Sequence, residues 1–386
     1  MDYKLKNPVI AIFLSRLNIA GIQRMRINLA KKFVELGFDV HIVVTSADGS
    51  LRETIPDIIS IVELAPKGFF TYFPKLFRYL ATRKPTHVLS SYEDITLILL
   101  IIRTFFGFKF NLVISAHNAL SHVKSEKGFG NLIKYKVVFF AMRLLYSKAT
   151  AVVAVSQGLA EEVAKLCNCS LDRVKVIYNP VIADNFKQLK DEEPTVDIDL
   201  ICLKYPIIGF FGRLHPQKRV DILIQAFSLV RSENECKLLI CGSGKELSNL
   251  KKLAKKLNLL EDTIFLGDVS NPFPVMRRCN MVVLSSDYEG LGNVLVEAMA
   301  CGVQVVSTNC PYGPSEILED GRLGQLVPTN NPLELARAIK YSLSKEFWID
   351  PELLIRASNK FSLSKAAEQY LSALDLPKHC GKDKQV

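Results

Sequence analysis

Short apolar runs alternate with amphipathic stretches along most of the chain. Residues 9–14 form a continuous apolar run, which predicts a strand buried on both faces. The helical stretch that follows has Ile27 and Phe33 on its apolar side and ends at Gly37, a residue type common at helix C-termini. Residues 40–44 then predict a second strand. This strand–helix–strand order is typical of a parallel sheet.

The same pattern recurs in two blocks. Further apolar runs of strand length lie at residues 87–89, 112–114 and 151–155, and then at 206–211, 237–241, 263–266, 281–284 and 304–307. We therefore expect an α/β protein with two Rossmann-like, doubly wound domains facing each other across a cleft. The predicted limits are an N-terminal domain over 1–182, a C-terminal domain over 183–360, a helix within 361–377 that packs back on the first domain, and a tail over 378–386. The acidic stretch 184–200 is interpreted as a hinge or linker.

Composition excludes several classes of protein. With 49% hydrophobic and 23% charged residues, the chain is neither disordered, collagen-like nor a small disulfide-stapled protein. Its net charge of +10 is uneven, because residues 1–182 hold 24 basic and 13 acidic side chains whereas residues 183–386 hold 25 and 26. This excess favours an anionic partner of the first half, although a Lys-rich solvated face would give the same count.

The nine cysteines fit no metal-ligand spacing, and most lie in apolar runs, which favours a reduced, cytoplasmic protein. The N-terminus is not typical of a secretory signal, and the apolar run near residues 97–102 is far too short to span a bilayer.

Candidate chemistry lies directly after predicted strands, where open α/β sheets bind ligands. After residues 281–284, the loop carries Glu289, Gly290 and Gly292, and a helix is expected near Asn293 with Glu297 one turn in. Glycines permit close approach to a ligand, free N–H groups at a helix start suit a phosphate, and carboxylates bind vicinal hydroxyls. An isolated loop of this kind would more often be a solvent-facing cap.

A second loop favours ligand binding over a solvent-facing cap. Gly212, Arg213 and Lys218 follow the strand predicted at 206–211, so two cations are expected at the same sheet edge, where they could hold a diphosphate without a metal ion. Glu316 follows the strand predicted at 304–307.

These residues resemble the retaining nucleotide-sugar glycosyltransferases of family 4, which have the GT-B fold. The resemblance runs from Val9 to about residue 375, and its most specific element is the pair Glu289 and Glu297 within EGLGNVLVEAMACG. The segments GRLHPQKRVDILIQAF and CGSGKELSNLKKLAKKL and the element around Glu316 are also similar to the family. Gly21 matches the family's glycine-rich first loop, although Ala20 replaces one of its two usual glycines.

The resemblance implies a role for each matching residue. Arg213 and Lys218 would hold the diphosphate, Glu289 the donor sugar and Glu297 the ribose. Further donor contacts would come from Gly21, Gly212, Gly290, Leu291, Gly292, Asn293 and, near the nucleobase, Val269, with Glu316 as a further candidate. His117 matches the family histidine that reaches the transferred sugar; by itself it would more often be a satisfied loop histidine.

The implied reaction is front-face transfer from a nucleotide sugar, expected to be a UDP-sugar, with retention of configuration and with neither cofactor nor metal. The acceptor, received by the N-terminal domain, would be a glycan or a lipid-linked glycan, as in polysaccharide or lipopolysaccharide synthesis. Alternatives with the same fold are a nucleotide-sugar epimerase and a non-catalytic partner subunit; a phosphorylase would need a pyridoxal phosphate lysine motif, which is not seen. A dinucleotide-dependent dehydrogenase is disfavoured, because no G-x-G-x-x-G follows the first strand.

Two segments of the first half combine aromatic and basic residues. Residues 67–84 hold five basic residues, six aromatics and no acid, and residues 124–148 are similar with one acid. Such segments either pack as ordinary core or anchor a protein in lipid headgroups. Together with the charge excess they favour peripheral contact with the cytoplasmic face of a membrane; no nucleic-acid-binding module is present in the sequence.

Overall fold

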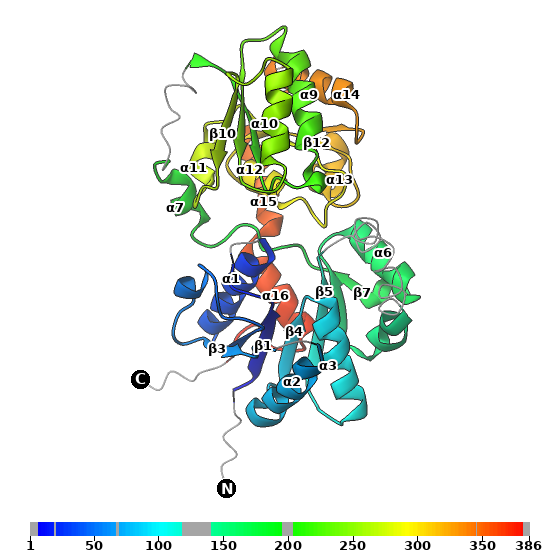
Figure 1. Ribbon diagram of the computed structural model, residues 1–386. Coiled ribbons are helices and arrows are strands. Elements are labelled where there is room, and N and C mark those ends of the chain that lie inside the picture. Colours follow the sequence, from blue (N-terminus) through cyan, green and yellow to red (C-terminus); the bar gives the residue numbers. More distant parts are fainter. Residues whose placement is uncertain are drawn as a thin grey trace. The chain divides into compact units, whose positions relative to one another are not determined.

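The computed structural model describes residues 7–18, 21–66, 69–117, 140–194, 204–344 and 346–380 (Figure 1). The chain divides into two compact units: unit 1 comprises residues 1–180 with 363–386, and unit 2 comprises residues 181–362. The sequence placed these boundaries after residues 182 and 360.

Unit 1 is built on a parallel sheet with the order β3-β2-β1-β4-β5-β6-β7. Its strands are β1 (Val9–Leu14), β2 (Asp39–Val44), β3 (Ser60–Glu63), β4 (His87–Ser90), β5 (Asn111–Ala116), β6 (Ala151–Ala154) and β7 (Val174–Val176). Its helices are α1 (Gly21–Glu35), η1 (Arg52–Thr54), α2 (Phe69–Arg83), α3 (Glu93–Phe105), η3 (Tyr146–Lys148), α6 (Gln157–Cys167), η4 (Leu171–Arg173) and α16 (Leu363–Ala373). The strand order reverses between β1 and β4.

Unit 2 repeats this plan with the order β10-β9-β8-β11-β12-β13. Its strands are β8 (Ile207–Phe211), β9 (Lys237–Cys241), β10 (Thr263–Gly267), β11 (Met281–Leu284), β12 (Gln304–Thr308) and β13 (Gln325–Val327). Its helices are α7 (Phe186–Asp191), η5 (Pro216–Lys218), α9 (Val220–Arg231), α10 (Leu247–Lys256), α11 (Phe273–Arg277), α12 (Asn293–Ala300), α13 (Pro314–Ile317), η6 (Glu319–Gly321), α14 (Pro332–Leu343), α15 (Pro351–Ser358) and η7 (Asn359–Phe361). The order reverses between β8 and β11.

Burial explains why continuous apolar runs identified most of these strands. Every residue of β4, β6, β8, β11 and β12 is buried, as expected for parallel strands covered by helices on both faces. The prediction of two doubly wound α/β domains is therefore confirmed.

The last helix, α16, belongs to unit 1 although all of unit 2 precedes it in the sequence. Its residues Tyr370 and Leu371 have no exposed surface and lie in the same core cluster as Ile27 and Phe33 of α1. Figure 1 shows α16 beside α1. Unit 1 thus needs both ends of the chain to close its core.

The prediction that residues 184–200 form a hinge or linker is wrong for the part that the structure describes, residues 184–194. Residues 186–191 form α7, and the Phe186 ring lies 4.6 Å from that of Phe273 in α11. Apolar side chains within the acidic stretch anchor it to unit 2, because Phe186 and Leu189 pack on the cluster that contains Phe273.

Within the described residues, no helix combines the length and apolar character that a bilayer crossing requires. The eight described cysteines are all free thiols.

Candidate active site

The loops that leave β8 and β11 meet at the point where the strand order of unit 2 reverses. In doubly wound sheets this point, at the carboxyl ends of the strands, is where ligands bind. The two loops are tied together by several bonds: the Asp287 N–H donates to Gln217 O (2.9 Å), Gln217 Nε2 donates to Tyr288 O (2.8 Å), and the Ser285 hydroxyl donates to Lys218 O (2.7 Å).

Lys218 and Glu289 form the centre of this arrangement. Lys218 Nζ lies 2.5 Å from Glu289 Oε1, and the Ser286 hydroxyl donates to the same oxygen at 2.6 Å. The two charged side chains are only 16% and 10% exposed, so water screens their attraction weakly. The structure therefore brings together two residues that the sequence predicted to act on one donor molecule. Cys310 lies close by, and burial raises the pKa of its thiol to about 12, so it is neutral.

Arg213 is the exposed cation of the same loop. Among the described residues, no hydrogen bond or ion pair to its guanidinium is found. An exposed guanidinium beside a partly buried ammonium suits an anionic ligand that arrives from solvent, because the guanidinium can form a bidentate contact with phosphate oxygens.

The sequence overlooked the residue that fixes this loop, Arg219. Its guanidinium pairs with Asp221 at 3.0 Å and with Asp287 at 3.2 Å, and it also donates to Asn330. Arg219 has a left-handed backbone (φ +46°) between η5 and α9. Lys218 is therefore restrained through the ion pairs of the adjacent Arg219 and through the hydrogen bond from Ser285 to its backbone oxygen. In the sequence, only its position next to Lys218 pointed to Arg219.

Close backbone packing joins a third loop to these two. A Cβ on Gly242 would lie 2.0 Å from Gly212 O, so only glycine fits there. The Gly242 N–H donates to Gly267 O (2.7 Å), and the Ser243 hydroxyl donates to Asp268 (2.5 Å). Val269, the predicted nucleobase contact, follows directly and is half-buried. The β8, β9 and β10 loops thus form one continuous edge.

The helix α12 begins at this edge with Asn293, and Gly292 caps it with a left-handed backbone (φ +93°). No side chain caps its N-terminus, and no acid lies in its first turn, so its dipole favours an anion there. Glu297 lies one turn into the helix, as predicted. The side chain of Leu291 is 2% exposed, so Leu291 can offer a ligand only its backbone.

Glu316 lies in α13, which follows β12. A Cβ on Gly313 would lie 2.0 Å from Leu291 O, and this contact places the start of α13 against the loop before α12. The structure thus brings the Glu316 helix to the same edge of the sheet as Glu289.

The predicted residues of unit 1 are at the carboxyl edge of its own sheet. Gly21 is the first residue of α1, and His117 directly follows β5. His117 is 9% exposed. Arg26 Nη2 lies 2.8 Å and Ser115 Oγ 3.0 Å from His117 Nε2.

A guanidinium can only donate, so Nε2 accepts and the imidazole is neutral. Burial first, and then the charge of Arg26, hold the pKa of His117 well below its usual range. Arg26 itself is 1% exposed and also donates to Tyr370 Oη at 3.2 Å. The sequence contained no signal for this cluster, since Tyr370 is 344 residues away from Arg26.

Within the described ranges, no group of three or more His, Cys, Asp or Glu side chains is arranged to hold a metal ion. One cavity, of about 290 Å³, lies beside the β8 loop and is lined by His215, Arg219 and residues of α9 and α10. Another, of about 540 Å³, lies in unit 1 away from the predicted site residues.

Two family models match consecutive parts of the chain. The model described as Glycosyltransferase Family 4 matches residues 19–185, and the model described as Glycosyl transferases group 1 matches residues 193–361. Together they cover most of both units.

Individual relatives and solved structures agree with these matches. The chain is 30% identical to an N-acetylgalactosamine-N,N'-diacetylbacillosaminyl-diphospho-undecaprenol 4-alpha-N-acetylgalactosaminyltransferase of Campylobacter jejuni, over 69% of this chain and 71% of the relative. It is 25% identical to the N-acetyl-alpha-D-glucosaminyl L-malate synthase of Bacillus anthracis, over 80% and 81%. The structure of Anabaena HepE with UDP and glucose superposes with a TM-score of 0.77 at 22% identity, over 95% of this chain and 99% of that one.

Proposed function

The chain belongs to the family 4 glycosyltransferases with the GT-B fold, and we propose that it transfers a sugar from a UDP-sugar to a glycan or lipid-linked acceptor, with retention of configuration and without a metal ion. One observation carries the proposal: the Lys218–Glu289 pair lies at the reversal point of the unit 2 sheet, with the exposed Arg213 in the same loop.

The two cations of the β8 loop supply the main chemical contribution. As the bond between the sugar carbon and the diphosphate breaks, negative charge grows on the phosphate oxygens. Arg213 and Lys218, with the N-terminus of α12, stabilise this charge without a metal ion. Because Lys218 pairs with Glu289, binding of the diphosphate would share this cation between the phosphate and the carboxylate.

Glu289 and its neighbours orient the sugar. A carboxylate accepts hydrogen bonds from vicinal hydroxyls, and the backbone of residues 290–293 supplies donors beside it. Glu297 is proposed to bind the ribose hydroxyls, and the segment ending at Val269 the nucleobase. Gly21 and His117 are proposed as further contacts to the donor. Glu316 is a further candidate.

The proposed step needs no protein base. The acceptor hydroxyl attacks the anomeric carbon on the face that the diphosphate leaves: a new carbon–oxygen bond forms, the bond to the phosphate breaks, and the hydroxyl proton passes to a departing phosphate oxygen. Retention follows from attack on the same face. An epimerase and a non-catalytic subunit are not favoured, because the C. jejuni relative is named as a transferase and the B. anthracis relative as a synthase.

The acceptor is proposed from the charge of the first half and from the relatives. The C. jejuni relative is named for a diphospho-undecaprenol substrate, whereas the B. anthracis relative is named for malate. The excess of 24 basic over 13 acidic side chains in residues 1–182 favours the lipid-linked class, with peripheral contact at the cytoplasmic face of a membrane.

A donor screen tests the proposal. Purified protein is incubated with UDP-, GDP- and ADP-sugars, with and without chelator, and nucleotide release and product configuration are measured. We expect release from a UDP-sugar, insensitive to chelator. Arg213→Ala and Lys218→Ala should each lower kcat by about 100- to 1000-fold, the range for loss of one preorganised charge-stabilising donor.

The matched control is Lys255→Ala, which removes an exposed lysine of α10 and should leave kcat unchanged. Circular dichroism and thermal unfolding of each variant separate lost chemistry from lost folding. Near-normal turnover of the double Arg213→Ala, Lys218→Ala variant would overturn the assignment of the site.

A further inference from the structure

An aromatic cluster lies where α2 meets the loop between α3 and β5. The Phe77 ring centre lies 5.5 Å from that of Phe106 and 5.0 Å from that of Phe108, and Phe73 lies 5.6 Å from Phe106. The cluster is not closed, because Phe105 is 71% and Phe106 52% exposed. Adjacent exposed phenylalanines of this kind are typical of a surface that contacts a protein partner, a ligand or a membrane.

This surface is at the amino edge of the unit 1 sheet. The loop leads into β5 at Asn111, beside the start of β4 at His87. His117 and the start of α1 lie at the opposite, carboxyl edge. The aromatic cluster is therefore not part of the proposed active site.

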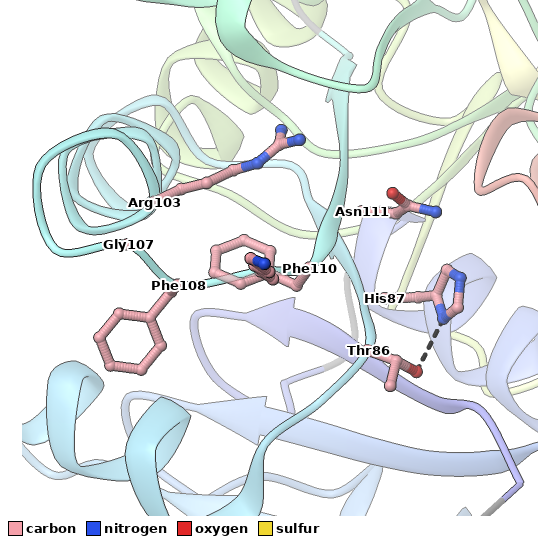
Figure 2. Close-up of a pocket in the computed structure, with 8 residues that line it drawn as sticks. Thr86, His87, Arg103, Gly107, Phe108, Phe110 and Asn111 are labelled. Atoms are coloured by element: carbon pink, nitrogen blue, oxygen red, sulfur yellow. Dashed lines mark hydrogen bonds between the residues drawn. The ribbon is translucent and has the colours of Figure 1, made fainter. Parts of the chain in front are cut away.

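A basic pocket adjoins the aromatic cluster. Its volume is about 540 Å³, and Arg103, Lys109, Asn111 and Thr86 are among the residues that line it (Figure 2). The guanidinium of Arg103 is fixed, since Nη1 donates to Lys148 O at 2.7 Å and the group lies 6.0 Å from the Phe110 ring centre. Figure 2 shows Arg103 and Asn111 on either side of Phe110. The pocket thus offers two cations, whereas its neutral donors are already engaged: the Asn111 amide donates to Leu374 O and the Thr86 hydroxyl to Val9 O.

Basic side chains predominate on the surrounding elements, although Asp375 is close enough to His87, which lines the pocket, to act on its charge. Residues 69–92, 95–117 and 140–160 contain no Asp or Glu, whereas they contain Lys75, Arg78, Arg83, Lys84, Arg103, Lys109, Arg143 and Lys148. The acids Glu93 and Asp94 lie in the first turn of α3, and Phe105 is its last residue. At 1.5 Å per residue, about 18 Å of helix separates the acids from the exposed rings.

We propose that this aromatic–basic edge, formed by Phe73, Phe77, Arg103, Phe105, Phe106, Phe108 and Lys109, docks on an anionic lipid bilayer. Phe105 and Phe106 enter the headgroup region, and Arg103 and Lys109 bind lipid phosphates. Exposed rings beside a predominantly basic surface are complementary to a bilayer that is apolar beneath and anionic outside. This inference rests on the proposed membrane contact of unit 1 and assigns it to particular residues.

The assignment differs from the segments that the sequence singled out. In residues 67–84, Phe73 and Phe77 are only half-exposed, because they pack within the cluster. Of residues 124–148, positions 124–139 lie outside the described residues, and in the described remainder Phe140 is 64% and Leu144 57% exposed. Phe106 of the cluster and the adjacent Phe105, which are 52% and 71% exposed, belong to neither segment.

Vesicle co-sedimentation of the full chain tests the proposal. Vesicles of phosphatidylglycerol with phosphatidylethanolamine should bind the protein, more weakly as salt increases, and phosphatidylcholine vesicles should bind it poorly. The double variant Phe105→Ser, Phe106→Ser should lose at least about tenfold in affinity. The double variant Arg103→Gln, Lys109→Gln should lose about 25-fold, at about fivefold for each cation.

Matched controls are taken from unit 2. Leu333→Ser removes an apolar side chain that is 58% exposed, and Lys255→Gln with Lys256→Gln removes two exposed cations. Both should bind vesicles as the wild type does. Thermal unfolding of all variants separates lost binding from lost folding, because Phe106 also packs on Phe73 and Phe77 and Arg103 donates to Lys148 O.

A fluorescent probe reports insertion directly. The chain has one tryptophan, Trp348, so Phe106→Trp in a Trp348→Phe background carries a single reporter. Its emission should shift to the blue with anionic vesicles and be quenched by brominated lipids, while wild-type emission should change little.

Each outcome is decisive. If the Arg103, Lys109 double variant and the control double variant lost the same vesicle affinity, or if emission from the Phe106→Trp reporter did not shift to the blue, the assignment of membrane contact to this edge would be wrong. A diffuse membrane contact of unit 1 would still be possible. Failure of the wild type to bind anionic vesicles would overturn both the edge and the membrane contact. Sugar transfer, measured by donor turnover, would stand in either case.

Discussion

Individual residues of the candidate site are held by partners that the sequence does not reveal. Glu289 is fixed by Lys218 at 2.5 Å and by the hydroxyl of Ser286 at 2.6 Å, on one oxygen. The second carboxylate oxygen has neither of these bonds and is the atom that we expect to meet a sugar hydroxyl. Substitutions can therefore distinguish the effect of losing a proposed donor-binding residue from that of losing a residue that orients it.

Glu289→Gln should lower kcat/KM by about 100-fold, because it removes the charge that pairs with Lys218 and accepts from the sugar. Ser286→Ala should cost only about fivefold, the effect of one lost hydrogen bond. Steady-state kinetics with the identified donor measures both. Ser228→Ala, in α9, is the control and should behave as the wild type. A larger loss for Ser286→Ala than for Glu289→Gln would contradict this order.

The histidines of unit 1 should make its stability sensitive to acid. Burial is the first cause that lowers the pKa of His41, His87 and His117 in the folded protein. Below the ordinary histidine value of 6.5, the unfolded chain binds protons that the folded chain cannot. The free energy of unfolding should therefore fall as pH decreases below about 6.5 and be fully present above it.

Urea unfolding at a series of pH values, followed by circular dichroism, measures this slope. His117→Gln keeps an acceptor for Arg26 but cannot be protonated, so its slope should be shallower than that of the wild type. Some slope should remain, because His41 and His87 still titrate. Equal slopes would show that His117 is not a source of the acid sensitivity.

At the level of elements, the sequence predicted strands well where they are buried on both faces. The runs at 9–14, 237–241 and 281–284 coincide with β1, β9 and β11. The strands it missed, β3, β7 and β13, all lie at sheet edges and are three or four residues long. An edge strand is covered less completely, so its composition need not be continuously apolar.

The candidate site shows the same division. Arg213, Lys218, Glu289 and Glu316 could be placed at one sheet edge, because parallel strands bring their following loops together. The ties between loops could not be predicted: the contact of Gly242 with Gly212 O, and the pairing of Arg219 with Asp287, depend on tertiary geometry. The exposure of Phe105 and Phe106 could not be predicted either, because both residues lie in an ordinary apolar run of the sequence.

The helix α16 gives an element-level prediction. Tyr370 has no exposed surface, and its hydroxyl accepts from Arg26 and lies 3.0 Å from Ser115 Oγ. Tyr370→Phe leaves the ring under the Arg26 guanidinium but removes an acceptor from a buried charge. We expect the free energy of unfolding to fall by about 2 kcal/mol. Ser372→Ala, two residues further along α16 on its exposed side, should change the free energy of unfolding little. Urea unfolding compares the two variants.

At the scale of the whole chain, the proposals assign two groups of positive charge to two different partners. Unit 2 carries Arg213 and Lys218 in a nearly neutral background, whereas the aromatic–basic edge of unit 1 lies in predominantly basic segments. The edge is at the amino ends of its strands, and His117 is at the carboxyl ends. With strands of six residues such as β5, the two edges are about 20 Å apart, so a lipid-linked acceptor would need to extend well beyond its phosphate to reach the carboxyl edge.

Hydrogen exchange followed by mass spectrometry should separate these partners in the intact chain. UDP should slow exchange in the β8 and β11 loops, residues 212–219 and 286–293, because bound phosphate occupies their N–H groups and restrains the loops. Anionic vesicles should instead slow exchange around residues 103–110. Salt should weaken the vesicle effect far more than the UDP effect, since exposed charges are screened more strongly than partly buried ones. Protection of residues 103–110 by UDP alone would contradict the separation of the two sites, because no part of that edge belongs to the proposed donor site.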